Sequence, residues 1–128
     1  MLTSISQTTT YNLRNLMGAN EVIDLNDHRT PGARVFTGRP RGEQVRLASR
    51  IDELERNADH ITVRIPVNTI TVNPSFLEEL LRYVVKRLGP KRFREKFSFD
   101  NNGGKYDIRE NLDLAIENIM RGTNALVA

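Results

Sequence analysis

The stretch that decides the fold occupies residues 72–88 and reads V-N-P-S-F-L-E-E-L-L-R-Y-V-V-K-R-L. It joins an expected strand to an expected long helix. Asn73 suits the capping position before a helix, and Pro74 suits the first helical position. Ser75 followed by Glu78 has the spacing of a capping box, in which each side chain bonds the backbone of the other residue. These residues predict a strand-to-helix joint with a well-marked helix start.

The interior of this helix is apolar at helical spacing, and Gly89-Pro90 is expected to end it. The apolar positions are Phe76, Leu77, Leu80, Leu81, Val84, Val85 and Leu88. A helix with this pattern buries one broad face against the rest of the protein.

Upstream of this helix, the pattern predicts two short strands that meet across a turn, at Glu21–Leu25 and Ala33–Phe36. The segment T-G-R-P-R-G-E at residues 37–43 is expected to be a loop, because it holds two glycines and a proline. A helix is then expected over Glu43–Ala58, with Val45, Ala48, Ile51 and Leu54 on its inner face. The alternation of Ile61, Val63 and Ile65 with polar residues predicts a short strand that ends at Pro66.

Downstream, the basic segment Lys91–Lys96 leads into a strand at Phe97–Phe99. Asp107 is expected to cap a last helix that ends at Gly122. The resulting order is β-β-α-β-α-β-α. It predicts a small α/β domain, with a mixed sheet that is parallel in its second half and helices packed on it. We expect a loosely ordered segment at 1–20, the domain at 21–122 and a short tail at 123–128.

Composition excludes several classes of function. The chain has 128 residues, no cysteine and a formal net charge of +3. It can therefore form neither a disulfide nor a thiolate metal site, and it holds no apolar run long enough to span a membrane. We expect a cytoplasmic protein. No cofactor and no metal is predicted, because His28 and His60 stand alone and far apart.

An arginine series dominates residues 28–50, where six arginines accompany a single acid, Glu43. Glycine-flanked arginines before a helix can bind an anion or an acidic partner through guanidinium groups and backbone N–H groups. The equal alternative is a solvated basic face that pairs with Asp52, Glu53 and Glu55. A P-loop signature is missing, so nucleotide hydrolysis is not predicted. The candidate residues for a partner or an anion are Arg34, Gly38, Arg39, Arg41, Gly42 and Arg46.

Ser75 is a candidate phosphosite, because a helix N-terminus favours negative charge. The alternative, which we favour, is that Asn73, Ser75 and Glu78 only cap the helix. Glu78 and Glu79 are adjacent and point about 100° apart on a helix, so they are not expected to act as an acid–base pair. No catalytic residue is predicted, and we expect a protein that is not an enzyme.

Two stretches carry a resemblance to a known family. P-G-A-R-V-F-T-G-R-P-R-G-E-Q-V-R at residues 31–46 resembles the P-x-G-R…G-x-x-S-G-E-x-F-R stretch of the STAS-like domains of unknown function. I-T-V-R-I-P-V-N-T-I-T-V-N-P-S-F-L-E-E-L-L at residues 61–81 is similar to that family's strand followed by S-S-F-L-E-E. The chain departs from the family pattern at Thr37, Arg41, Val45 and Pro74.

The resemblance implies the fold of sulfate-transporter and anti-sigma-factor-antagonist domains. Such domains are similar to switch modules that bind a GHKL-type ATPase or kinase and are phosphorylated at a helix start. It implies a regulatory module, bacterial or phage, that binds a protein partner, and leaves its oligomeric state open. The alternative hypothesis is a nucleic-acid-binding regulator of a mobile element or phage, using the basic series from Arg29 to Arg50.

Overall fold

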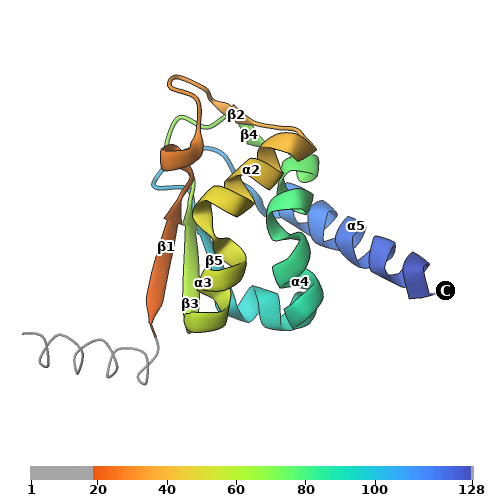
Figure 1. The fold of residues 1–128 in the computed structure, drawn as a ribbon. Coiled ribbons are helices and arrows are strands. Elements are labelled where there is room, and N and C mark those ends of the chain that lie inside the picture. The colour runs from red at the N-terminus through yellow and green to blue at the C-terminus, as the bar shows by residue number, and fades with distance from the viewer. Residues whose placement is uncertain (1–18, 128) are drawn as a thin grey trace, which may run out of the picture.

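The computed structural model describes residues 19–127, with side chains as far as Gly122. The segment expected at 1–20 therefore lies almost wholly outside the described residues. The chain is a small α/β protein, as predicted (Figure 1). Its elements are β1 (Asn20–Asp24), the 3-10 helix η1 (Leu25–His28), β2 (Val35–Phe36), α2 (Arg39–Ser49), α3 (Ile51–Asn57), β3 (His60–Arg64), β4 (Thr71–Val72), α4 (Pro74–Lys96), β5 (Phe97–Asp100) and α5 (Arg109–Val127).

The described strands form two small sheets where one mixed sheet was expected. The larger sheet has the order β1-β3-β5, and the smaller one pairs β2 with β4. Each of these strand pairs is parallel. The prediction that the first two strands meet across a turn is wrong, because β1 pairs with β3 and β2 pairs with β4. Between them, the Asp24 side chain accepts a hydrogen bond from the Asn26 N–H at 2.9 Å and starts η1, so no hairpin forms.

The larger sheet buries one face against helices. Ile23, Ile61, Val63 and Phe97 point into the core, whereas Val22 points outward. This alternation follows from the two-residue period of a strand. Figure 1 shows α2, α3 and α4 on one side of β1, β3 and β5, with α5 beyond α4. No helix among the described residues combines the length and apolar character needed to cross a membrane.

The segment at residues 37–43 is a helix start, so the expected loop there is wrong. Gly38 takes a positive φ of 91° as the N-cap of α2, and Pro40 lies in the first turn. Proline fits that turn because its missing N–H would have no partner inside the helix. The single helix expected over 43–58 is two helices, since Arg50 adopts a left-handed conformation with φ of 57°. Ala48 consequently faces solvent instead of the core.

Two expected helix ends also differ. Gly89 leaves helical geometry at φ 79° and ψ 160°, as predicted, but Pro90 begins a further helical segment that extends to Lys96. The last helix continues past Gly122 to Val127, so the expected tail is part of α5. A glycine inside a helix costs conformational entropy but does not by itself stop the helix.

The tightest packing contact joins α2 to the first turns of α4. A Cβ atom at Gly42 would lie 2.3 Å from the Phe76 carbonyl oxygen and 2.9 Å from Glu79 Cβ. Only glycine allows the two helices to cross at this separation. The apolar residues beneath the crossing, Val45, Phe76, Leu77 and Leu80, are buried in the core.

A buried carboxylate ties α3 to the far part of α4. Glu55 is fully buried, and its Oε2 pairs with the Arg87 guanidinium. Lys96 Nζ donates to the Glu55 carbonyl oxygen at 2.6 Å and lies 3.6 Å from Glu55 Oε1. The second distance is that of an ion pair without a hydrogen bond. Glu55 thus holds residues from both sides of the Gly89 kink.

Gly42→Ala should lower the free energy of unfolding by about 1 to 3 kcal/mol, because the added methyl group must push α2 away from the Phe76 carbonyl. Gly122→Ala is the matched control, since nothing lies within 4 Å of a Cβ atom there. That control should be neutral or stabilise by up to about 1 kcal/mol. Urea denaturation followed by circular dichroism measures both, and equal effects would contradict the close crossing.

Arg87→Met should destabilise far more than Arg94→Met, although the two arginine side chains are 48% and 47% exposed. Arg87 pairs with Glu55, which is 0% exposed, whereas Arg94 pairs with Asp113, which is 63% exposed. Loss of Arg87 leaves the buried Glu55 carboxylate with Lys96 alone, 3.6 Å from its Oε1, at a cost of about 3 kcal/mol. Loss of Arg94 should cost about 0 to 1 kcal/mol. Chemical denaturation measures both variants. If the midpoints of Arg87→Met and Arg94→Met agree within experimental error, the pairing of Arg87 with buried Glu55 does not stabilise the fold as expected.

Candidate functional site

Two strand-to-helix joints lie next to each other at one edge of the small sheet. β2 leads into α2 through Thr37 and Gly38, and β4 leads into α4 through Asn73. The Asn73 N–H donates to the Phe36 carbonyl at 2.8 Å, and Asn73 Nδ2 donates to Thr37 Oγ1 at 2.6 Å. Because β2 and β4 are parallel and in register, both helices begin at the same edge. We call this region, made of Thr37, Gly38, Arg39, Asn73 and Ser75, the joint surface.

The predicted capping box at the start of α4 is wrong. Asn73 occupies the N-cap position, but its side chain makes no capping bond and instead holds Thr37. Pro74 begins the helix, which makes Ser75 its second residue and not its cap. Ser75 is partly exposed, and within residues 19–122 no side chain hydrogen-bonds its hydroxyl.

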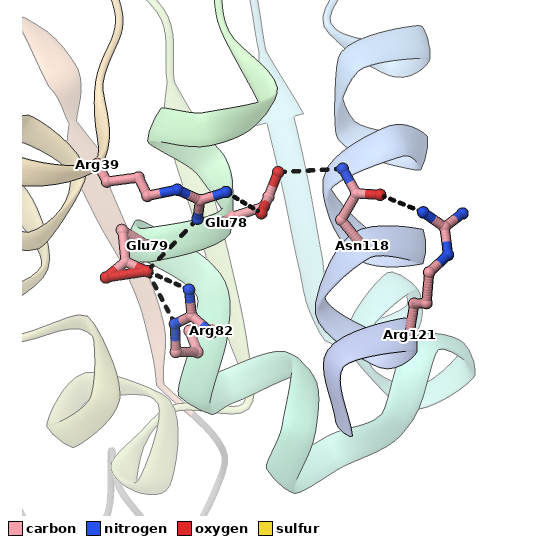
Figure 2. A network of polar contacts seen from close by, with 6 residues as sticks. All are labelled: Arg39, Glu78, Glu79, Arg82, Asn118 and Arg121. Atoms are coloured by element: carbon pink, nitrogen blue, oxygen red, sulfur yellow. Dashed lines mark hydrogen bonds and ion pairs between the residues drawn. The ribbon is translucent and has the colours of Figure 1, made fainter. Parts of the chain in front are cut away.

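Glu78 connects three helices instead of capping one (Figure 2). Its Oε1 lies 2.9 Å from Arg39 Nη2 of α2, and its Oε2 accepts from Asn118 Nδ2 of α5 at 3.1 Å. Only 8% of Glu78 is exposed, so its charge needs these partners. The Glu78 carboxylate thus links α2 and α5 to α4 and helps to fix how these two helices pack against it.

Glu79 pairs with arginine side chains of α4 and α2. Arg82 Nε donates to Glu79 Oε2 at 2.8 Å, and Arg39 Nη1 lies 3.9 Å from the same oxygen (Figure 2). The Arg39 guanidinium therefore bridges two adjacent carboxylates while its side chain stays 53% exposed. Because these two carboxylates balance its charge, Arg39 gives the joint surface hydrogen-bond donors but little net charge.

Arg46 is buried between α2 and α4. Its Nη1 donates to the Glu79 carbonyl at 2.7 Å, and its guanidinium lies 4.9 Å from the centre of the Tyr83 ring. Its Nε is 3.9 Å from Asp52 Oδ2. Burial raises the pKa of the Asp52 carboxyl above its ordinary value, and the Arg46 charge acts in the opposite direction. With these contacts, Arg46 packs the helix crossing and is not available to a partner.

The remaining arginines of the series also have partners inside the described part of the chain. Arg34 Nε donates to the Asn68 carbonyl at 3.1 Å, and Arg41 Nη2 donates to Thr30 Oγ1 at 2.8 Å. Arg29 binds Ala33 and Asn68, and Arg50 pairs with Glu53.

Of the expected acidic partners, Asp52 and Glu53 do pair with the series, whereas Glu55 binds Arg87 and Lys96. Gly42 lies buried at the helix crossing and does not line an anion-binding loop. These contacts reduce what the series offers to phosphate groups. Nucleic-acid binding through it stays a prediction.

Several residues of this region were not found from the sequence. Thr37 was noted only as a departure from a family pattern, and Asn118 lies 40 positions from its partner Glu78. The available signal was local: T-G-R-P and V-N-P-S each place a capping residue and a proline after a strand, as at two equivalent joints. Within the described residues, no group of three or more histidine or acidic side chains is placed to hold a metal ion.

Glu78→Gln should lower the free energy of unfolding by about 1 to 2 kcal/mol, because a neutral amide loses the charge-assisted bond to Arg39. Glu117→Gln is the control, because Glu117 is exposed and, among the described side chains, its ion-pair partner is Arg121 one helical turn away. It should change stability by no more than about 0.5 kcal/mol. Thermal unfolding at neutral pH compares the two, and a control as destabilising as Glu78→Gln would refute the buried network.

Comparisons with known proteins were made at three levels. No family model, no curated protein and no solved structure matches this chain. The likeness to STAS-like domains therefore rests on the two quoted stretches, and the assignment of this chain to that family stays a prediction.

Proposed function

We propose that this protein is a non-enzymatic regulatory module of STAS-like type that binds a protein partner through the joint surface. The partner that the STAS-like resemblance suggests is a GHKL-type ATPase. The observation that carries the proposal is the position of the two helix starts. Polar, accessible groups of Thr37, Arg39 and Ser75 come together there from segments nearly forty residues apart.

The chemistry of this surface favours docking over catalysis. Arg39 is neutralised by Glu78 and Glu79, and Asn73 is engaged by Thr37. Groups held in this way offer a defined pattern of hydrogen bonds to a partner. Because the backbone beneath them is fixed by β2–β4 pairing and by the Gly42 crossing, the surface is preorganised and loses little entropy on binding.

Ser75 is the residue through which such a surface would be regulated. Within residues 19–122 no side chain hydrogen-bonds its hydroxyl, and the first turn of a helix tolerates negative charge because of the free N–H groups there. Phosphorylation would add about −1.5 to −2 charge at this point. Since Ser75 is the second residue of the 23-residue helix α4, the added charge would alter the docking surface without unfolding the helix.

Ser75→Asp should weaken partner binding about tenfold or more, because it places a carboxylate at the centre of the joint surface. Affinity purification from the native cell, followed by mass spectrometry, identifies the ATPase. Isothermal titration calorimetry with the purified partner then measures the dissociation constants. Ser98→Asp is the matched control, because Ser98 is exposed on β5 in the other sheet.

The control should bind as the wild-type chain does. Recovery of no GHKL-type ATPase would count against the named partner. If the ATPase binds both Ser75→Asp and Thr37→Arg as tightly as it binds the wild-type chain, the contact lies elsewhere. That result would refute docking at the joint surface. Phosphopeptide mapping of the chain purified from the native cell tests the modification of Ser75 separately.

A further inference from the structure

A cavity lies at the carboxyl edge of the larger sheet, where β3 and β5 end. Its volume is about 590 Å³, and its lining includes Ile65 after β3, Asp100 at the end of β5 and the start of α5. Small-molecule sites commonly have volumes of about 300 to 1,000 Å³. In α/β proteins they form beyond the carboxyl ends of parallel strands. Both the size and the position of this cavity are those of a ligand site.

The floor of the cavity is apolar. Ile65, Ile108 and Leu112 are buried residues of the core, and Phe99 packs partly buried against them. Ile65 directly follows β3 and Phe99 lies in β5, whereas Ile108 directly precedes α5 and Leu112 lies in its first turn. A floor of this composition favours a ligand with a hydrocarbon or aromatic body, because burial of that body removes apolar surface from water.

Among the described residues, one cation on the rim has no ion-pair partner. Asp107 accepts hydrogen bonds from the Arg109 guanidinium at 2.7 to 3.0 Å, and these bonds lower the pKa of Asp107 to about 2. Asp100 Oδ2 lies 3.9 Å from Arg64 Nε. Lys105 is exposed and, among the described residues, has no acceptor for its ammonium group. Asp100 and Asp107 balance the formal charges of Lys105 and Arg109 in the lining, and Lys105 is the lining cation whose ammonium group is open to a ligand carboxylate among the described residues.

The wall that carries Lys105 is held in a defined shape. Asn101 Nδ2 donates to the carbonyls of Gly104 at 2.9 Å and Tyr106 at 3.2 Å. Asn102 adopts a left-handed conformation with φ of 56°, and a Cβ atom at Gly104 would lie 2.5 Å from the Val67 carbonyl oxygen. Tyr106 Oη donates to the Val72 carbonyl at 3.1 Å. A wall built in this way exists before a ligand arrives, which lowers the entropy cost of binding.

We propose that this cavity binds a small organic anion, a carboxylate with an apolar chain or ring. The apolar body lies on Ile65, Phe99, Ile108 and Leu112, and the carboxylate pairs with Lys105. The site is separate from the joint surface, which belongs to the β2–β4 sheet and the start of α4. Ligand binding and partner docking can therefore be tested independently.

Octanoate is the probe for this site, with octan-1-ol as its uncharged counterpart. Titration of the full chain followed by ¹H–¹⁵N correlation spectra should give saturable shifts for amides of Ile65 and residues 99–112. Amides of Thr37–Arg41 and Ser75–Phe76 should not shift. Octan-1-ol should bind more weakly, because it lacks the charge that pairs with Lys105.

Lys105→Met removes the charge and keeps the length of the side chain, and it should weaken octanoate binding roughly three- to fivefold. Lys91→Met is the matched control, because Lys91 is also exposed but lies on α4 outside the cavity. It should leave the dissociation constant unchanged. The proposal is overturned if octanoate gives no saturable shifts or shifts amides elsewhere. It is equally overturned if Lys105→Met binds octanoate as tightly as Lys91→Met does.

Discussion

The crossing of α2 over the start of α4 at Gly42 is the contact on which the rest of the structure depends. Close approach of the two backbones lets Val45, Phe76 and Leu80 fill the core without a gap. It also brings Arg39 within 2.9 Å of Glu78 and lets Arg46 reach the Glu79 carbonyl. A larger residue at position 42 would separate the two helices, and these polar contacts would be lost together.

Two buried carboxylates fix α4 at its two ends. Glu78 joins the first turns of α4 to α2 and α5, and Glu55 of α3 binds Arg87 and Lys96 on both sides of the kink at Gly89. Each carboxylate depends on charged partners from other parts of the chain, because an unpaired buried charge is costly. Such pairs add little net stability compared with apolar packing. They disfavour alternative arrangements of the helices, which would keep the proposed joint surface in a constant shape.

The carboxyl edges of the two sheets differ in their chemistry. At the carboxyl edge of the β2–β4 pair, helices start directly after the strands and present polar groups that are already paired. At the carboxyl edge of the β1-β3-β5 sheet, a longer loop lies between β5 and α5 and leaves a cavity with an apolar floor. The length of the connection decides the difference: a short joint closes the edge, whereas a loop of several residues leaves room beside the sheet.

Local chemistry alone predicted strands at residues 21–25, 61–65 and 97–99, which the structure places at 20–24, 60–64 and 97–100. It likewise predicted the long helix that begins at Pro74 and the small α/β class, because period and capping residues act over a few positions. It also indicated the break at Gly89, since glycine readily adopts the conformation seen there. Local chemistry did not predict which strands pair. Val35 pairs with Thr71 and Ile61 with Phe97, across 36 residues each, and no local pattern specifies such a register.

The same limit explains the errors at the candidate site. Ser75 and Glu78 have the spacing of a capping box, but in the folded chain Glu78 gains more from Arg39 and Asn118, both about 40 residues away. Gly38 and Gly42 predict a flexible loop. Only the position of Phe76 in the folded chain shows that Gly42 is needed for a helix crossing. Sequence by itself determined the approximate positions of three strands and the start of the long helix. The tertiary structure decided which charges meet, because electrostatic and packing energies depend on distances that only the assembled fold defines.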